Sequence, residues 1–289
     1  MALLNSIALA GVGNLGSHVL DALLANGSFA VTVLTRASSD KTFPAGVNVQ
    51  RVDYDDEAQL EAAVKGVDAV VSTLMARDAQ AVLIRAAKKA GVKLFVPGEF
   101  GNAPVKNGLE KHPALLGKVK TQELLKELEL PAILVYPGSF LDSVFQPFLG
   151  WDFAARKVRL VGAGETPIAF TTRRDVARFL VHHLAGLSAL PAPDKPEKLI
   201  LEGDRKTFRE VVALYERTHP GVTLEIEDVP RAEVEEKAKD VAGDFRGSLT
   251  AHLLIEREVG STAKLEELAN GEWPEWKPLS VEEFLETLP

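Results

Sequence analysis

The first half of the chain alternates between short apolar runs and longer amphipathic stretches. The apolar runs predict strands at residues 6–10, 30–34, 47–52, 68–73, 93–96 and 132–136. The stretches between them repeat apolar residues at helical spacing, at 15–25, 57–64, 79–90 and 113–129. Strands that lack polar alternation and are separated by helices are typical of a parallel sheet covered on both faces. With right-handed crossovers, this pattern predicts an α/β fold with a doubly wound, parallel-sheet Rossmann domain.

The pattern changes after residue 150. Residues 157–161 and 168–172 predict strands on either side of a glycine turn at 162–164. A hydroxyl residue followed three positions later by a carboxylate predicts three capped helix starts, at Thr172, Thr207 and Ser280. We therefore expect an NAD(P)-binding domain in residues 1–150 and a smaller α+β substrate-binding portion in 151–289. The alternative to a fully separate portion is one that contributes a strand or a helix to the main sheet.

A glycine-rich string follows the first predicted strand and opens the first predicted helix. Gly11, Gly13 and Gly16 have the spacing G-x-G-x-x-G. In this context the glycines allow a tight turn, a close approach of the backbone to a pyrophosphate, and close packing of helix on strand. The helix start at Asn14, Leu15 and Gly16 offers free amides and a positive dipole end to phosphates. The motif therefore predicts binding of a nicotinamide dinucleotide.

The residues after the second strand favour NADPH over NADH as the cofactor. Proteins specific for NAD place an acidic residue there, about 20 residues after the motif, to hold the ribose 2′-hydroxyl. This chain has Arg36 instead, followed by Ser38 and Lys41. A guanidinium suits a 2′-phosphate, and the hydroxyl and the ammonium supply further donors. Asp40 lies close by in the sequence and leaves NAD open as the alternative.

Further cofactor contacts follow from the geometry of a doubly wound sheet, whose ligands lie at the carboxyl ends of the strands. They are expected after the third, fourth and fifth strands, at Asp53, Thr73, Leu74, Met75, Pro97, Glu99 and Phe100. Adenine is expected beside Asp53 and Tyr54, and the nicotinamide beside residues 97–101.

Composition narrows the classes of partner. The formal net charge of −8 argues against a nucleic-acid partner, because phosphate binding requires a basic surface. The chain has no cysteine, which excludes disulfides and thiolate chemistry. Its apolar start lacks a basic flank, and no apolar run approaches the about 20 residues that span a membrane. A cytoplasmic protein without membrane contact is therefore expected.

Several common catalytic patterns are missing from the sequence. The pair Tyr-x-x-x-Lys does not occur, because Tyr54, Tyr136 and Tyr215 are followed four positions later by Ala58, Phe140 and His219. The six histidines form no H-E-x-x-H cluster, so no metal site is expected. His182 and His183 are adjacent and would point in different directions on a helix. A G-x-S-x-G nucleophile elbow is also absent.

Lys118 is the candidate catalytic residue, on the helix predicted to begin at Pro113. One face of this helix carries Lys118, Thr121, Leu125 and Leu128, and another carries Lys120, Glu123 and Glu127. Lys118 therefore lies at the edge of the apolar stripe, whereas Lys120 is solvated. Partial desolvation would lower the pKa of Lys118 and make it a usable acid or base. The alternative is a lysine that packs its stem and extends its ammonium to water.

Three segments resemble the NmrA-like and isoflavone reductase-like branch of atypical short-chain dehydrogenases. They are the glycine motif with Arg36, the string from Val96 to Gly101, and Lys118 through Pro131. The resemblance covers residues 5–145 well and continues more loosely at 171–175 and 202–204. It implies NADPH as hydride donor, a small aromatic or phenolic substrate, and a catalytic lysine at Lys118 beside the cofactor.

The sequence departs from that family at three places. Ala10 and Gly11 stand where the family often has two glycines, Gly98 replaces a serine, and Gln122 with Glu123 replaces an arginine pair. The dinucleotide role survives these changes, but they leave the particular substrate open.

These arguments predict an NADPH-dependent reductase that acts on an isoflavonoid-like or phenylpropanoid-like substrate, with Lys118 as the acid or base. The expected apolar walls of the substrate pocket are Phe100, Tyr136, Phe140 and Phe145. The alternative is an NmrA-like regulatory protein that senses NAD(P) without turnover. The oligomeric state is left open.

Overall fold

A parallel five-stranded sheet lies at the centre of the structure, a computed structural model that describes residues 2–102, 113–260 and 262–289. In spatial order its strands are β3 (Asn48–Val52), β2 (Ala30–Arg36), β1 (Ser6–Ala10), β4 (Ala69–Ser72) and β5 (Leu94–Val96). All four neighbouring pairs are parallel. The order reverses after β3, as a doubly wound sheet requires, so the predicted Rossmann fold is confirmed.

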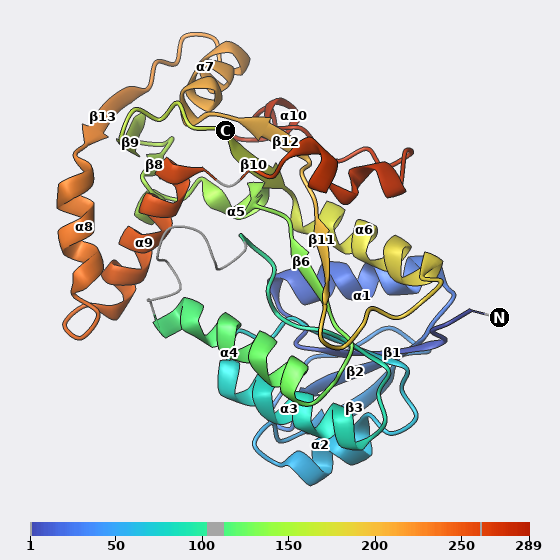
Figure 1. The fold of residues 1–289 in the computed structure, drawn as a ribbon. Helices are drawn as coiled ribbons and strands as arrows, with labels where there is room; N and C mark the ends of the chain where they lie inside the picture. The colour runs from blue at the N-terminus through green and yellow to red at the C-terminus, as the bar shows by residue number, and fades with distance from the viewer. Residues whose placement is uncertain (1, 103–112, 261) are drawn as a thin grey trace.

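Two further strands extend the sheet beyond β5 (Figure 1). A parallel bridge joins Phe95 to Ala132, at the start of β6 (Ile133–Tyr136). β11 (Glu197–Ile200) then pairs in parallel with β6, so a strand from the second half of the chain returns to the sheet.

Helices cover both faces of the sheet, and this explains why its strands lack polar alternation. One face carries α1 (Asn14–Asn26) and α6 (Arg173–Gly186), which pack against each other; the other carries α2 (Glu57–Ala63), α3 (Arg77–Lys89) and α4 (Pro113–Glu127). In β1, Ile7 and Leu9 belong to the first core, whereas Ala8 and Ala10 belong to the second. Because both faces of the sheet are buried, these residues are apolar whichever face they point to.

The rest of the chain forms two small sheets with their own apolar cores. One contains β12 (Asp204–Lys206), β10 (Ile168–Thr171) and β7 (Ser139–Phe140); the other contains β13 (Glu225–Val229), β9 (Lys157–Val161) and β8 (Trp151–Asp152). The two strands expected around the glycine turn at 162–164 therefore exist but belong to different sheets. β9 pairs with β13, while β10 pairs with β12 and β7.

The helices of this portion lie around the small sheets. They are α5 (Leu141–Val144), α7 (Phe208–Thr218), α8 (Arg231–Lys239), α9 (Phe245–Val259) and α10 (Val281–Leu285), with 3₁₀ turns η2 (Pro147–Leu149), η3 (Leu265–Glu267) and η4 (Ala269–Glu272). Thr207 and Ser280 form complete capping boxes, as predicted. Thr172 accepts a hydrogen bond from the amide of Asp175, which caps α6.

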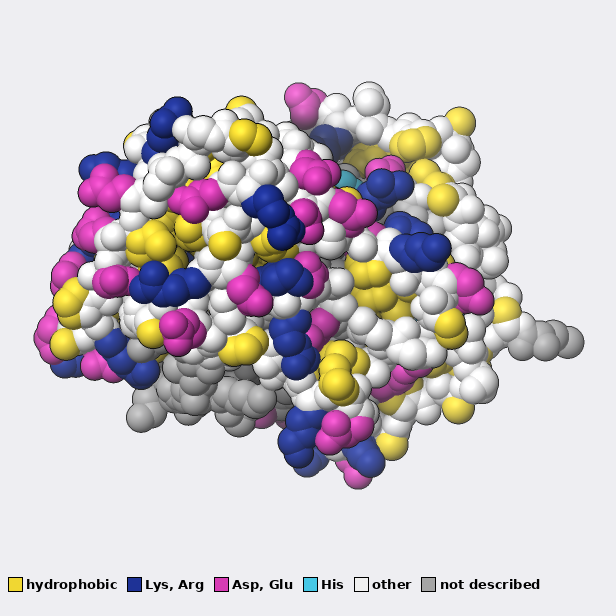
Figure 2. Space-filling model, turned by 90° about the horizontal axis from the view of Figure 1, so that it is seen from above, with side chains coloured by type: hydrophobic (Ala, Val, Ile, Leu, Met, Phe, Trp, Pro, Cys, Tyr) yellow, Lys and Arg dark blue, Asp and Glu magenta, His cyan; other side chains and the backbone are white. Residues whose placement is uncertain are grey.

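The outer surface of the second portion is densely charged. Figure 2 looks down on the molecule and shows Lys and Arg side chains interspersed with Asp and Glu. On α8, ion pairs one turn apart join Arg231 to Glu235 and Lys237 to Glu233. Among the described residues, none of the helices is both long and apolar enough to span a membrane.

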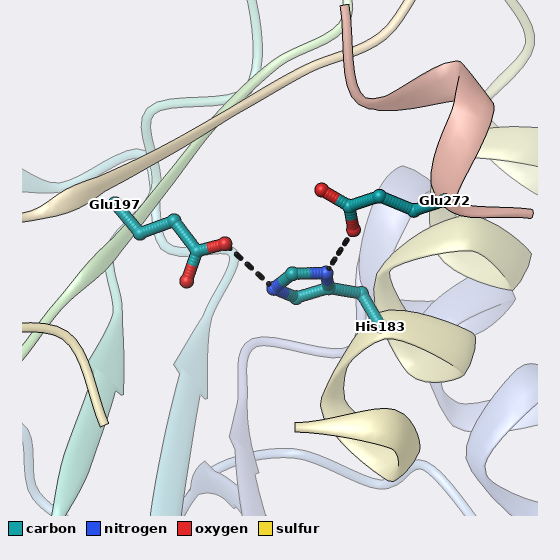
Figure 3. A group of neighbouring side chains, drawn as sticks. All are labelled: His183, Glu197 and Glu272. Carbon is teal, nitrogen blue, oxygen red and sulfur yellow. Dashed lines mark hydrogen bonds and ion pairs between the residues drawn. The ribbon is translucent and has the colours of Figure 1, made fainter. Parts of the chain in front are cut away.

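A histidine joins the end of α6 to β11 and η4 (Figure 3). The Nδ1 atom of His183 is hydrogen-bonded to Glu272 at 2.8 Å, and its Nε2 atom lies 3.2 Å from a carboxylate oxygen of Glu197. Burial alone would lower the pKa of His183, but the two carboxylates outweigh it and raise the pKa. A metal ion would need the three ligand atoms to converge on one point. Carboxylates at opposite ends of the ring suit a protonated imidazole instead.

We expect His183→Gln to destabilise the protein in a pH-dependent way. Because the pKa of the folded state is raised, the contribution of the imidazolium is full below the unfolded pKa of about 6.5. It is lost as the pH rises through the higher folded pKa. The deficit in the free energy of unfolding should be about 1 kcal/mol near pH 6 and shrink in alkaline buffer. Urea denaturation across that range measures it, with His18→Gln on α1 as the control. A deficit independent of pH would contradict the ionic role.

Candidate functional site

The turn between β1 and α1 is built on the close approach of two glycines. Gly11 has φ +85°, a left-handed conformation that favours glycine. A Cβ atom on Gly16 would lie 1.9 Å from the carbonyl oxygen of Gly11, so no other residue fits there. α1 starts without a side-chain cap and without an acidic residue in its first turn. Its first amides are therefore available to an anion, as a dinucleotide pyrophosphate requires.

A cleft of about 790 Å³ lies along the carboxyl ends of β1, β2, β3 and β4. Most of the residues predicted to contact the cofactor line it, namely Gly11, Gly13, Arg36, Ser38, Lys41, Asp53, Thr73, Leu74 and Met75. No neighbouring atom occupies the space that a Cβ on Gly13 would take, so its backbone is open to a ligand. Tyr54 also lines the cleft and donates a hydrogen bond to the Leu34 carbonyl at 2.9 Å.

The loop after β2 places several cationic and hydroxyl groups at one end of this cleft. Arg36 is exposed there beside Ser38 and Ser39. Lys41 donates a hydrogen bond at 2.5 Å to the carbonyl of Val12, inside the glycine motif. Arg51, which the sequence did not single out, donates to the carbonyls of Ser39 and Lys41 and so holds the loop. This donor set fits a phosphate on the ribose.

The remaining predicted cofactor residues lie outside the lining of the cleft. Asn14, Leu15 and Gly16 form the first turn of α1, where their amides have no partner within the helix. Pro97 is buried at the start of the loop that follows β5. Glu99 is 1% exposed and lies under Lys118, while Phe100 and Lys118 line a different cavity.

A buried glutamine connects the end of β4, the loop after β5 and helix α4. The Oε1 atom of Gln80 accepts hydrogen bonds from the Ser72 hydroxyl at 2.8 Å and from the amide of Gly98 at 2.7 Å. Its Nε2 atom donates to Thr121 Oγ1 at 3.3 Å. Gln80 is fully buried, and the sequence alone did not identify it. It couples the turn that carries Glu99 to the helix that carries Lys118.

Helix α4 presents Lys118 to the interior, as its sequence pattern predicts. Lys118 is 8% exposed, and Thr121 and Leu125 on the same face are also buried. Lys120 is exposed, together with Glu123 and Glu127.

Compared with water, the surroundings of Lys118 favour the neutral form of its amine. Its Nζ atom donates a hydrogen bond to the carbonyl of Glu99 and lies 4.0 Å from the carboxylate of the same residue. Burial lowers the pKa of Lys118, and Arg77 lowers it further, although Glu99 and Glu256 oppose the shift. Burial also raises the pKa of Glu99, against the charges of Lys118 and Arg77. The lowered pKa brings Lys118 closer to the range in which a lysine gives up its proton.

A second cavity, of about 350 Å³, brings Lys118 together with residues from the second portion. Phe100 and Phe140, two of the four residues predicted for the substrate pocket, line it. The segment 98–101 connects this cavity to the cleft: Gly98 packs against the carbonyl of Leu74 in the cleft, and Gly101 lies against Lys118 Nζ. An ammonium group beside aromatic walls and a dinucleotide cleft suits proton transfer during hydride chemistry.

Two of the residues predicted for the substrate pocket do not line this cavity. Phe145 is buried in an aromatic core, with its ring centroid 4.9 Å from that of Trp151. Tyr136 is 5% exposed and accepts a hydrogen bond at 3.2 Å from Gln122. Both are absent from the lining of the cavity. Neighbouring residues of one segment point in different directions, and the strand pattern alone did not decide which aromatic faces the cavity.

Helix α9 supplies lining residues that sequence reasoning missed. Leu253, Glu256 and Arg257 lie on this helix and face the cavity. Their spacing of three and four positions marks one face of a helix. That signal was present, but the sequence held nothing to indicate which element this face would meet.

Comparison with known proteins adds four findings. The model of the NmrA-like family matches residues 6–285. Oxidoreductase aprR of Aspergillus flavus is 35% identical over 68% of this chain and 66% of its own length. Phenylcoumaran benzylic ether reductase PT1 of Pinus taeda is 32% identical over 78% of each chain. The solved complex of leucoanthocyanidin reductase with NADPH from Vitis vinifera shares the fold, with a TM-score of 0.79 at 18% identity over 97% of this chain and 98% of that one.

We expect Gln80→Leu to destabilise the protein by about 2 kcal/mol, because it leaves the Gly98 amide and the Ser72 hydroxyl buried without their acceptor. Urea denaturation measures the loss. Gln146→Leu is the control, since Gln146 is exposed. Equal stability of the two variants would show that the Gln80 network contributes little.

Proposed function

Because the chain belongs to the NmrA-like family, as its glycine motif and the segments around Glu99 and Lys118 predict, we propose that it is an NADPH-dependent reductase of a small aromatic or phenolic substrate. The observation that carries the proposal is the buried Lys118 amine, which lines a cavity with Phe100 and Phe140 next to the dinucleotide cleft. The names of the two relatives, an oxidoreductase and a benzylic ether reductase, support the reaction class.

The cleft would hold NADPH with its pyrophosphate at the start of α1 and its 2′-phosphate at Arg36, Ser38 and Lys41. The NADPH complex of the Vitis vinifera neighbour supports this choice of cofactor. Bound NADPH supplies the hydride. The cofactor domain is then residues 1–150, while the portion 151–289 completes the substrate cavity.

Lys118 would act on the oxygen of the substrate. Its protonated amine donates a hydrogen bond to that oxygen and releases the proton as negative charge develops there. The carbonyl of Glu99 keeps the amine oriented, and the rings of Phe100 and Phe140 exclude water and hold an aromatic body.

The cofactor assignment predicts that Arg36→Ala reduces the preference for NADPH over NADH by about tenfold to a hundredfold, because charge-assisted bonds to the 2′-phosphate are lost. Calorimetric titration with NADPH, NADH and NADP⁺ measures this preference. Arg85→Ala removes an exposed arginine of α3 and should change nothing. If the wild type binds neither dinucleotide, the cofactor proposal fails.

The role of Lys118 predicts that Lys118→Met retains NADPH binding but loses about 10²- to 10⁴-fold in turnover. Lys120 lies two positions further along the helix and is exposed, so Lys120→Met should remain active. Because burial lowers the pKa of Lys118, an acid at this position is active below that pKa and inactive above it. The alkaline limb of kcat/KM should therefore lie below pH 10.5, the ordinary value for lysine.

Steady-state NADPH oxidation with a panel of enones, quinones and benzylic ethers tests both variants. Full turnover in Lys118→Met would contradict the acid role. Binding of NADPH without oxidation by any wild-type preparation would contradict the reductase and favour a dinucleotide sensor.

A further inference from the structure

Helix α9 places a buried arginine at the wall of the Lys118 cavity. Arg257 is 9% exposed, and among the described residues its Nη1 atom has no hydrogen-bond partner. Arginine carries five N–H donors and no acceptor, so a buried and unpaired nitrogen is costly. In Figure 1, α9 lies across from the start of α4, the helix that carries Lys118. The two buried cations therefore come from different portions of the chain and meet at one cavity.

The neighbouring carboxylate does not satisfy this arginine. Glu256 also lines the cavity, but consecutive residues of a helix do not face each other. No ion pair joins Arg257 to a carboxylate in the part of the chain that the structure describes. Burial raises the pKa of Glu256, which weakens it as a counter-charge, and burial lowers the pKa of Arg257 to about 10. Both shifts have burial as their main cause, so both ions lose hydration at this wall, and Glu256 offsets only part of that loss for Arg257.

The remaining walls are suited to an apolar body. The aromatic rings of Phe100, Phe140 and Phe148 and the side chain of Leu253 line the same cavity. A volume of about 350 Å³ is at the small end of ligand pockets. The cavity thus combines aromatic walls with two cationic groups.

We propose that Arg257 binds an anionic oxygen of the substrate, so that the protein takes small aromatic compounds carrying a carboxylate or a phenolate. The guanidinium pairs with the anion in the bidentate geometry typical of arginine. Lys118 remains free to act on the oxygen that receives the proton. This inference rests on the proposed function, because it assigns the substrate class of the same cavity.

The test is calorimetric titration of the full chain, with and without NADP⁺, using benzoate, 4-nitrophenolate and neutral benzamide. We expect at least one anion to bind tenfold or more tightly than benzamide, and the two anions distinguish a carboxylate from a phenolate site. Arg257→Met should abolish this preference while leaving benzamide and NADPH affinities unchanged. Arg257→Lys keeps the positive charge but loses the bidentate geometry of the guanidinium, so it should retain part of the preference for anions.

Two variants control for folding and for charge. Arg246→Met removes an exposed arginine of the same helix and should behave as the wild type. Glu256→Gln combined with Arg257→Met keeps the net charge of α9 unchanged and should lose the anion preference even if the single variant is unstable.

The inference is overturned if wild-type protein binds benzamide as well as both anions, or if the preference survives in Arg257→Met. Failure of the reductase proposal has a separate signature. In that case no compound supports NADPH oxidation, yet the preference for anions and its dependence on Arg257 persist.

Discussion

The buried amine of Lys118 beside the buried carboxyl of Glu99 is the constraint on which the site depends. Moving either charge out of water is costly unless it is paired at close range. Here the ammonium donates to the carbonyl of Glu99, while the carboxylate lies 4.0 Å away. The amine is therefore held in place, and burial lowers its pKa. A fixed position and a lowered pKa are the combination that acid–base chemistry by a lysine needs.

That arrangement requires three elements to keep their mutual positions. Gln80 connects them, since it binds the end of β4, the turn before Glu99 and, through Thr121, helix α4. Arg77 adds a second connection, because it donates to the carbonyl of Gly98 and its stem packs against Gly117. A Cβ atom on residue 117 would lie 2.7 Å from Cγ of Arg77, so the glycine leaves room for the stem of the arginine.

The cleft and the cavity differ in how the chain builds them. The cleft consists of residues from the first four strands and the segments that follow them. The cavity needs α4 and the loop after β5 together with β7, α5 and α9. Its shape therefore depends on how the second portion sits on the sheet. α6 packed on α1 and β11 paired with β6 provide that attachment, and His183 joins these two elements. Cofactor binding is thus expected to tolerate changes in the second portion that alter substrate choice.

The sequence by itself determined the doubly wound sheet, the glycine turn and the inward face of α4, because each follows from local periodicity or from the conformation of a few consecutive residues. It also indicated Arg36 and Lys118, since a position at the end of a strand or on a helix face is a local property. Only the tertiary structure decided that Phe140 lines the cavity while Phe145 is core, that Gln80 joins three elements, and that Arg257 lines the same cavity as Lys118. These depend on contacts between residues far apart in the chain, and no local pattern of apolar and polar residues encodes which distant face each will meet.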